Sequence, residues 1–255
     1  MTLLKTVLAG GLAAAVITGC SPAPESTAEE TASAQTQAAA KSPAPTETGD
    51  STRPPPIEPE TVEVLKEITP GPNVYITARD GGGGAIYIFD QEGTYKGDLP
   101  TGKYMQFKPS KDGKTGYLTT IYYERISHGP AKAYFQAYDL ITLALKSEVE
   151  IPSHIAPSGT DTHMLSTSTD EKFAYVQNAT PATSITVVNI AENKVASEVP
   201  IPGCWGAYPA QQGYKFTSLC GDGTVITVTL SETGELASKA ISAKLFDPEG
   251  DPLFT

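Results

Sequence analysis

The chain has 255 residues and a formal net charge of −11, with a sequence isoelectric point of about 4.7. Residues 61–255 keep 15 basic against 22 acidic residues, a net charge of −7, so the sequence predicts no nucleic-acid partner, whose phosphates an acidic chain repels. About 195 residues are enough for one domain with a substantial core.

Residues 1–20 are predicted to be an export signal of the lipoprotein type. Lys5 precedes an apolar run from Val7 to Ile17, which at about thirteen residues is too short for a membrane-spanning helix. Gly19 and Cys20 then resemble the lipobox of bacterial lipoproteins, in which the cysteine is lipidated. An ordinary cleaved signal, with Cys20 lost or left as an odd thiol, is the alternative. Either outcome predicts export.

Residues 21–60 are rich in Ala, Ser, Thr, Pro and Glu and have almost no large apolar side chains. Such a segment buries too little surface to offset the entropy of ordering it. We predict a disordered linker, stiffened by the three prolines at 54–56. If Cys20 carries a lipid, this linker holds the following domain away from the membrane.

Residues 61–255 show short β-rich runs between turn signals and no long helical period. The runs come in pairs: 74–77 with 86–90, 116–122 with 133–139, 173–177 with 184–189, and 214–219 with 224–229. Asp90, Asp139 and Asn189 each end a pair and precede a further strand such as 144–151 or 194–201. A period of about 40–50 residues predicts an all-β fold, a β-propeller with about four blades. A β-sandwich with an accidental period is the alternative.

Two cysteines lie on neighbouring predicted strands. Cys204 lies on one β-segment, and Cys220 ends the next, before a tight turn at Gly221-Asp222-Gly223. The two would be able to meet, and a bridge closing about fifteen residues stabilises a fold by about 3 kcal/mol in an oxidising compartment.

No catalytic or metal centre is predicted. His128, His154 and His163 lack the paired spacing of a metal site, and Gly81–Gly84 lacks the Lys and Ser or Thr of a phosphate-binding loop. The acidic stretch Asp247–Asp251 has two prolines and no regular alternation of ligands, so a solvated turn is favoured over a calcium loop. No nucleophile elbow occurs, which argues against a self-sufficient hydrolase.

Several stretches together resemble one known family, the heavy subunit of quinoprotein amine dehydrogenases, and within it the aromatic amine dehydrogenase branch and the methylamine dehydrogenase heavy chain. The stretches are Thr119–Gly129, Val176–Ile185, Gly203–Trp205, Cys220–Gly223, Gly234–Ser238 and Asp251–Phe254. The run Gln-Asn-Ala-Thr-Pro-Ala-Thr-Ser at 177–184 is the most specific of them.

The resemblance implies a seven-bladed propeller of which this chain holds roughly the first four blades, and a heavy-chain disulfide between Cys204 and Cys220. It implies a structural or subunit-interface role for Glu124 and Arg125. It also implies a periplasmic assembly of two heavy and two small subunits, which oxidises primary amines to aldehydes and ammonia and reduces a blue-copper protein of the azurin or amicyanin type. The cofactor, tryptophan tryptophylquinone, belongs to the small subunit.

The sequence supports a separate cofactor-bearing chain, because Trp205 is its only tryptophan and the quinone is made from two. The lipobox, the long linker and the glycine-rich stretch 81–84 depart from what the family implies. A stand-alone lipoprotein propeller that acts as a binding or scaffold module is therefore the alternative function.

Overall fold

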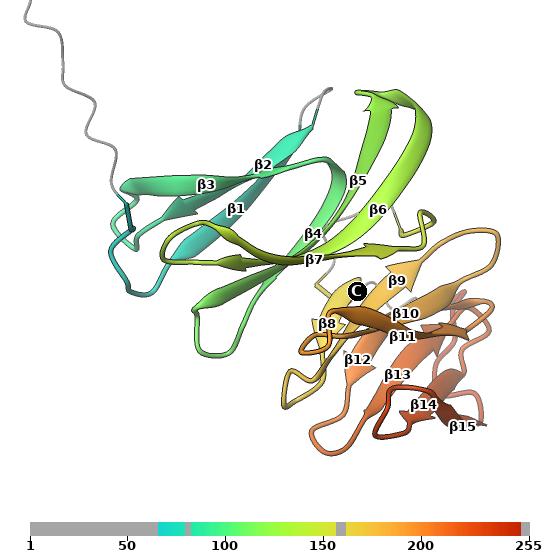
Figure 1. The fold of residues 1–255 in the computed structure, drawn as a ribbon. Helices are drawn as coiled ribbons and strands as arrows, with labels where there is room; N and C mark the ends of the chain where they lie inside the picture. The colour runs from blue at the N-terminus through green and yellow to red at the C-terminus, as the bar shows by residue number, and fades with distance from the viewer. Residues whose placement is uncertain (1–65, 80–82, 157–161, 251–255) are drawn as a thin grey trace, which may run out of the picture. The chain divides into compact units, whose positions relative to one another are not determined.

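The computed structural model describes residues 66–79, 83–156 and 162–250. These residues form fifteen β-strands and no helix (Figure 1). Accordingly, they contain no helix long and apolar enough to cross a membrane. The export signal and Cys20, the linker, and parts of the 81–84 and 247–251 stretches lie outside the described residues.

The strands form four antiparallel sheets in chain order, each a meander in which consecutive strands pair. The first sheet has three strands: β1 (Val74–Arg79), β2 (Gly84–Phe89) and β3 (Tyr95–Thr101). The second has four: β4 (Lys103–Pro109), β5 (Thr115–Arg125), β6 (His128–Asp139) and β7 (Leu145–Ile151).

The third and fourth sheets repeat the four-stranded plan. The third contains β8 (Leu165–Thr167), β9 (Phe173–Asn178), β10 (Ser184–Asn189) and β11 (Lys194–Pro200). The fourth contains β12 (Cys204–Pro209), β13 (Lys215–Cys220), β14 (Val225–Leu230) and β15 (Leu236–Ile241).

The turn before the last strand of a sheet is closed by a side chain of its own. Asp90 accepts the backbone N–H of Thr94 at 2.7 Å, and Asp139 accepts those of Ile141 and Thr142, each at 2.9 Å. Asn189 does the same in the third sheet, for Glu192 at 3.1 Å. Short polar side chains favour such turns because they replace a backbone acceptor. This explains why the three residues recur at the predicted positions.

Three apolar cores join each sheet to the next. β9 shows how one strand serves two of them: Phe173 and Tyr175 lie in the core shared with the fourth sheet, and Ala174 and Val176 lie in the core shared with the second. This follows from the alternation of side chains along a strand. The remaining core, between the first two sheets, includes Ile86, Ile88, Leu99, Met105 and Leu118.

The second and third sheets are therefore buried on both faces. A sandwich buries one face of each of two sheets, so the sandwich alternative is wrong and the predicted propeller is confirmed. The eight paired runs predicted from the sequence are all strands.

Two features of the second and third sheets differ from the predicted ones. β5 extends to Arg125, whereas the sequence predicted a strand that ends at 122. β6 begins at His128, whereas the sequence predicted a strand that begins at 133. A proline usually interrupts a strand, but Pro130 lies at the register shift between the Tyr123–Ala131 and Arg125–His128 pairs, where it has no paired residue on β5 and its missing N–H costs no ladder bond. The strands β4 and β8 were not predicted, because β8 has three residues and β4 is interrupted by a bulge.

Candidate functional site

The hairpin of β5 and β6 projects beyond the rest of its sheet (Figure 1). β4 pairs with β5 only as far as Ile121, and β7 pairs with β6 only from Ala133. Residues 122–132, which we call the hairpin arm, therefore form a two-stranded ribbon. At its tip Ile126 is 69% exposed. Two-stranded ribbons are marginally stable alone, and both outer edges of this one lack a neighbouring strand among the described residues.

Glu124 and Arg125 lie on the arm and are both exposed. Their predicted interface role fits this placement and stays a prediction.

A hollow of about 570 Å³ opens at the base of the arm. Its apolar wall consists of Tyr122, Tyr123, Pro130 and Tyr134. Its charged residues are Glu124, Lys132 and Glu148. The rings of Tyr122 and Tyr134 are tilted to one another with centroids 5.9 Å apart. The hollow thus combines aromatic faces with two carboxylates.

Two of the charged residues in the hollow have partners outside its lining. The Nζ of Lys132 lies 3.0 Å from Glu150, an exposed ion pair that neutralises the only cation in the wall. Glu148 accepts a hydrogen bond from the buried amide of Gln136 at 2.6 Å. That contact sets the orientation of the amide, since the opposite orientation would place two acceptors together. Burial also raises the pKa of Tyr122, which keeps its hydroxyl neutral.

A second polar cluster lies where β9 ends and β10 begins. The amide of Asn178 donates to the hydroxyls of Ser184 and Thr186, at 2.9 and 2.8 Å. The hydroxyl of Ser184 donates to Glu198 at 2.6 Å, and the Nε2 of His154 lies 3.0 Å from the same carboxylate oxygen. These residues include the most specific part of the family-like run.

This cluster is not arranged as a nucleophilic triad. In a triad the histidine stands between serine and acid, whereas here the acid stands between Ser184 and His154. Burial raises the pKa of Glu198, but the hydrogen bonds from Ser184 and His154 outweigh it and the net pKa is lowered. The cluster therefore holds the start of β10 against β11 and the segment before residue 157.

The fourth sheet contains the disulfide. Cys204 on β12 and Cys220 on β13 are direct partners in the ladder, and their sulfurs are bonded at 1.98 Å. Trp205, the next residue, pairs with Leu219 and is half-buried. A bulge follows in which Gly206 has φ of 75°, a conformation that suits glycine.

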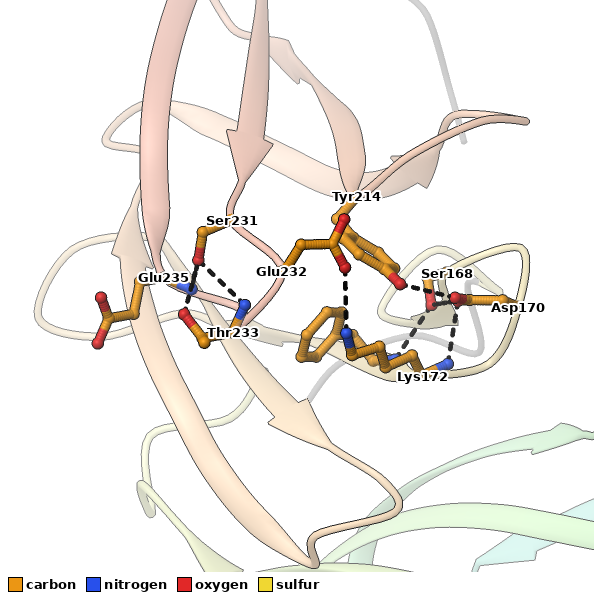
Figure 2. A network of polar contacts seen from close by, with 9 residues as sticks. Ser168, Asp170, Lys172, Tyr214, Ser231, Glu232, Thr233 and Glu235 are labelled. Carbon is orange, nitrogen blue, oxygen red and sulfur yellow. Dashed lines mark hydrogen bonds and ion pairs between the residues drawn. The ribbon is translucent and has the colours of Figure 1, made fainter.

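Figure 2 shows a third polar network, between the β8–β9 turn and the fourth sheet. Asp170 accepts the hydroxyls of Ser168 at 2.7 Å and Tyr214 at 2.9 Å. Lys172 lies 3.3 Å from Glu232 and 4.8 Å above the ring of Tyr214. Lys172 is paired with Glu232, and the carboxylate of Asp170 accepts two hydroxyls, which indicates a clasp between the third and fourth sheets. We call these four residues, Asp170, Lys172, Tyr214 and Glu232, the Asp170 clasp.

The histidines are engaged in separate places. His128 lies beside Ser127 on the arm, His154 contacts Glu198, and His163 stacks on Tyr208 with centroids 3.9 Å apart. Across the described ranges, no three His, Cys, Asp or Glu side chains lie close enough together to hold a metal ion.

A family model described as "Methylamine dehydrogenase heavy chain (MADH)" matches residues 74–255, well over half of the chain. The chain belongs to this family. The match includes Glu124, Arg125, Cys204 and Cys220, whereas Cys20 precedes it.

Within the methylamine dehydrogenase heavy chain family, the protein of Methylobacillus flagellatus is 26% identical to this chain over 170 residues. The alignment covers 66% of this chain and 42% of that protein, so the chain spans less than half the length of its relative.

Two solved structures are also similar. One is dihydro-heme d1 dehydrogenase NirN in complex with DHE, with a TM-score of 0.49, 16% identity, and coverage of 74% of this chain and 37% of the other. The second is the Kuenenia stuttgartiensis hydrazine synthase, with a TM-score of 0.40, 14% identity, and coverage of 63% and 42%.

The sequence did not single out the hollow. Tyr122, Tyr123 and Tyr134 read as ordinary strand residues. Tyr122 and Tyr123 lie beyond the last pair of β4 with β5, whereas Tyr134 still pairs with Glu150 of β7 and lines the hollow from the base of the arm. A usable signal was present: two adjacent tyrosines followed directly by charged residues at the end of a strand are unusual for a buried position.

Proposed function

We propose that this chain is a non-catalytic heavy subunit of an amine dehydrogenase. The observation that carries the proposal is the heavy-chain family match over residues 74–255. In the proposed reaction a primary amine and water become an aldehyde and ammonia, and two electrons and two protons leave the substrate. The tryptophylquinone of a small subunit would accept the electrons and pass them singly to a blue-copper protein.

The residues of this chain do not fit a quinone of its own. Making tryptophan tryptophylquinone requires two tryptophans, and the sequence has Trp205 alone. That side chain is half-buried beside the disulfide, on a strand paired with β13. No redox step is therefore assigned to this chain. Its proposed role is to present a rigid propeller surface to the small subunit and to shape access to that subunit's active site.

Aromatic amines are the proposed substrates. The support is the sequence resemblance to the aromatic branch, whereas the family model and the curated relative are both named for methylamine. A substrate panel of methylamine, benzylamine and phenylethylamine separates the two. The proposed location is the periplasm, with a membrane attachment if Cys20 is lipidated.

The test is co-expression of the intact gene with its neighbouring small reading frame, followed by purification through the large chain and a visible absorption spectrum. We expect a small chain to co-purify and its quinone band to bleach when a primary amine is added. A colourless propeller that purifies alone, with no such reading frame nearby, would instead support the stand-alone binding lipoprotein.

A further inference from the structure

We infer that the hairpin arm and its hollow are a docking surface for the small subunit, and that the hollow receives a basic side chain of that subunit, an arginine by its chemistry. The inference rests on the proposed function, because it names where the proposed partner binds.

The shape of the arm is the first argument. A two-stranded ribbon gains little stability from its own ladder, and neither β4 nor β7 supports residues 122–132. Its tip residue Ile126 is 69% exposed, and Tyr122 at its base is 38% exposed. Apolar side chains concentrated on a projecting element are typical of surfaces that a partner covers.

The chemistry of the hollow is the second argument. Two tyrosine rings whose centroids lie 5.9 Å apart present faces that attract cations. Glu124 and Glu148 add negative charge, while the wall's single cation, Lys132, is paired with Glu150. An anionic ligand is repelled by these carboxylates, whereas a cation is attracted by both the rings and the carboxylates.

Arginine fits the hollow better than a small amine does. A planar guanidinium stacks on a tyrosine ring and donates to a carboxylate at the same time. A hollow of about 570 Å³ is also open enough to admit the residues on either side of such a side chain. The folded region's net charge of −7 favours a basic partner surface.

The experiment measures the Kd between the purified full chain and the purified small subunit, by calorimetry at low and moderate salt. The variants are Glu124→Lys, which reverses a charge of the hollow, and Ile126→Asp, which places a charge at the tip. Leu245→Asp is the matched control for the second, since Leu245 is 67% exposed and its backbone N–H bonds to Gly223 in the β13–β14 turn, outside the arm. Glu235→Lys, in the exposed β14–β15 turn, is the control for the first. All four positions are exposed, and circular dichroism checks that each variant folds.

We expect each arm variant to weaken binding by about tenfold or more, and each control to stay within about twofold of the wild type. Glu124→Lys should also flatten the salt dependence of binding, because the attraction that salt screens is lost.

If the wild-type chains associate but the arm variants bind as the controls do, the docking surface is elsewhere and the proposed function stands. If the arm variants instead disrupt self-association of the large chain alone, the occupant is a second copy and the inference is overturned. Failure of the wild-type chains to associate refutes both proposals.

Discussion

Breaking the Cys204–Cys220 disulfide should destabilise the chain without changing its native structure. The bond joins residues separated by 16 positions, so cross-linking removes the loop-closure entropy of about fifteen residues from the unfolded chain. That corresponds to about 3 kcal/mol of unfolding free energy, against about 5–15 kcal/mol for a typical domain. In a domain of this size the melting temperature should fall by about 6–12 °C.

The assay is urea denaturation of the oxidised chain, the chain in dithiothreitol, and the double variant Cys204→Ala/Cys220→Ala. Alanine suits both positions because both cysteines are buried, and a serine hydroxyl would be buried without a designed partner. The double variant should match the reduced chain and should not respond to dithiothreitol. Cys20→Ala is the control for the third cysteine.

Trp205 tests the reasoning independently. As the only tryptophan, adjacent to Cys204, its fluorescence reports the native structure at the bridge. If the bond acts through the unfolded chain, the wavelength of maximum native emission is the same before and after reduction, while the intensity rises because the neighbouring disulfide no longer quenches the ring. A shift of that wavelength, or a loss below about 0.5 kcal/mol, would refute the entropic argument.

Two further changes test packing and charge. Tyr214→Phe should lower the free energy of unfolding, because it removes the hydroxyl bond to Asp170. The network lowers the pKa of Asp170 and, through that bond, raises the pKa of Tyr214. The loss of unfolding free energy in the variant should therefore be largest between about pH 4 and 10. It should disappear in acid as Asp170 is protonated, and fade above about pH 10 as Tyr214 ionises. An equal loss at about pH 3 would contradict this. Gly234→Ala should cost about 1–3 kcal/mol in thermal unfolding, because φ is 85° and a Cβ would lie 2.7 Å from Phe173. Gly213 has φ of 69° but no atom within 4 Å of the position of an added Cβ. Gly213→Ala therefore measures the cost of the backbone conformation without a steric clash, and should destabilise the chain less.

The sequence was sufficient for the strands that alternate clearly and end in a turn-forming residue. Asp139 and Asn189 marked sheet repeats correctly because each closes its own turn through its side chain. The three-residue β8 carried too little pattern to predict, and its position depends on pairing with β9.

The candidate site was less predictable than the fold. Glu124 and Arg125 were selected through a family resemblance, but the hollow beside them depends on where β4 and β7 stop pairing. The extent of this pairing depends on tertiary structure, so the pattern of residues within β5 and β6 does not predict it. The same holds for the Asp170 clasp, whose partners come from two sheets.

The chain-order meander of the sheets has a consequence for synthesis on the ribosome. Every strand pairs with a neighbour in sequence, so a sheet has all its partners as soon as its last strand has emerged. Each new sheet then covers the apolar face left by the one before it, as the three cores show. We expect protection to advance one sheet at a time in stalled nascent chains, and limited proteolysis of chains released after residues 151 and 200 would reveal it. Protection appearing only with the complete chain would show that the sheets are stable only together.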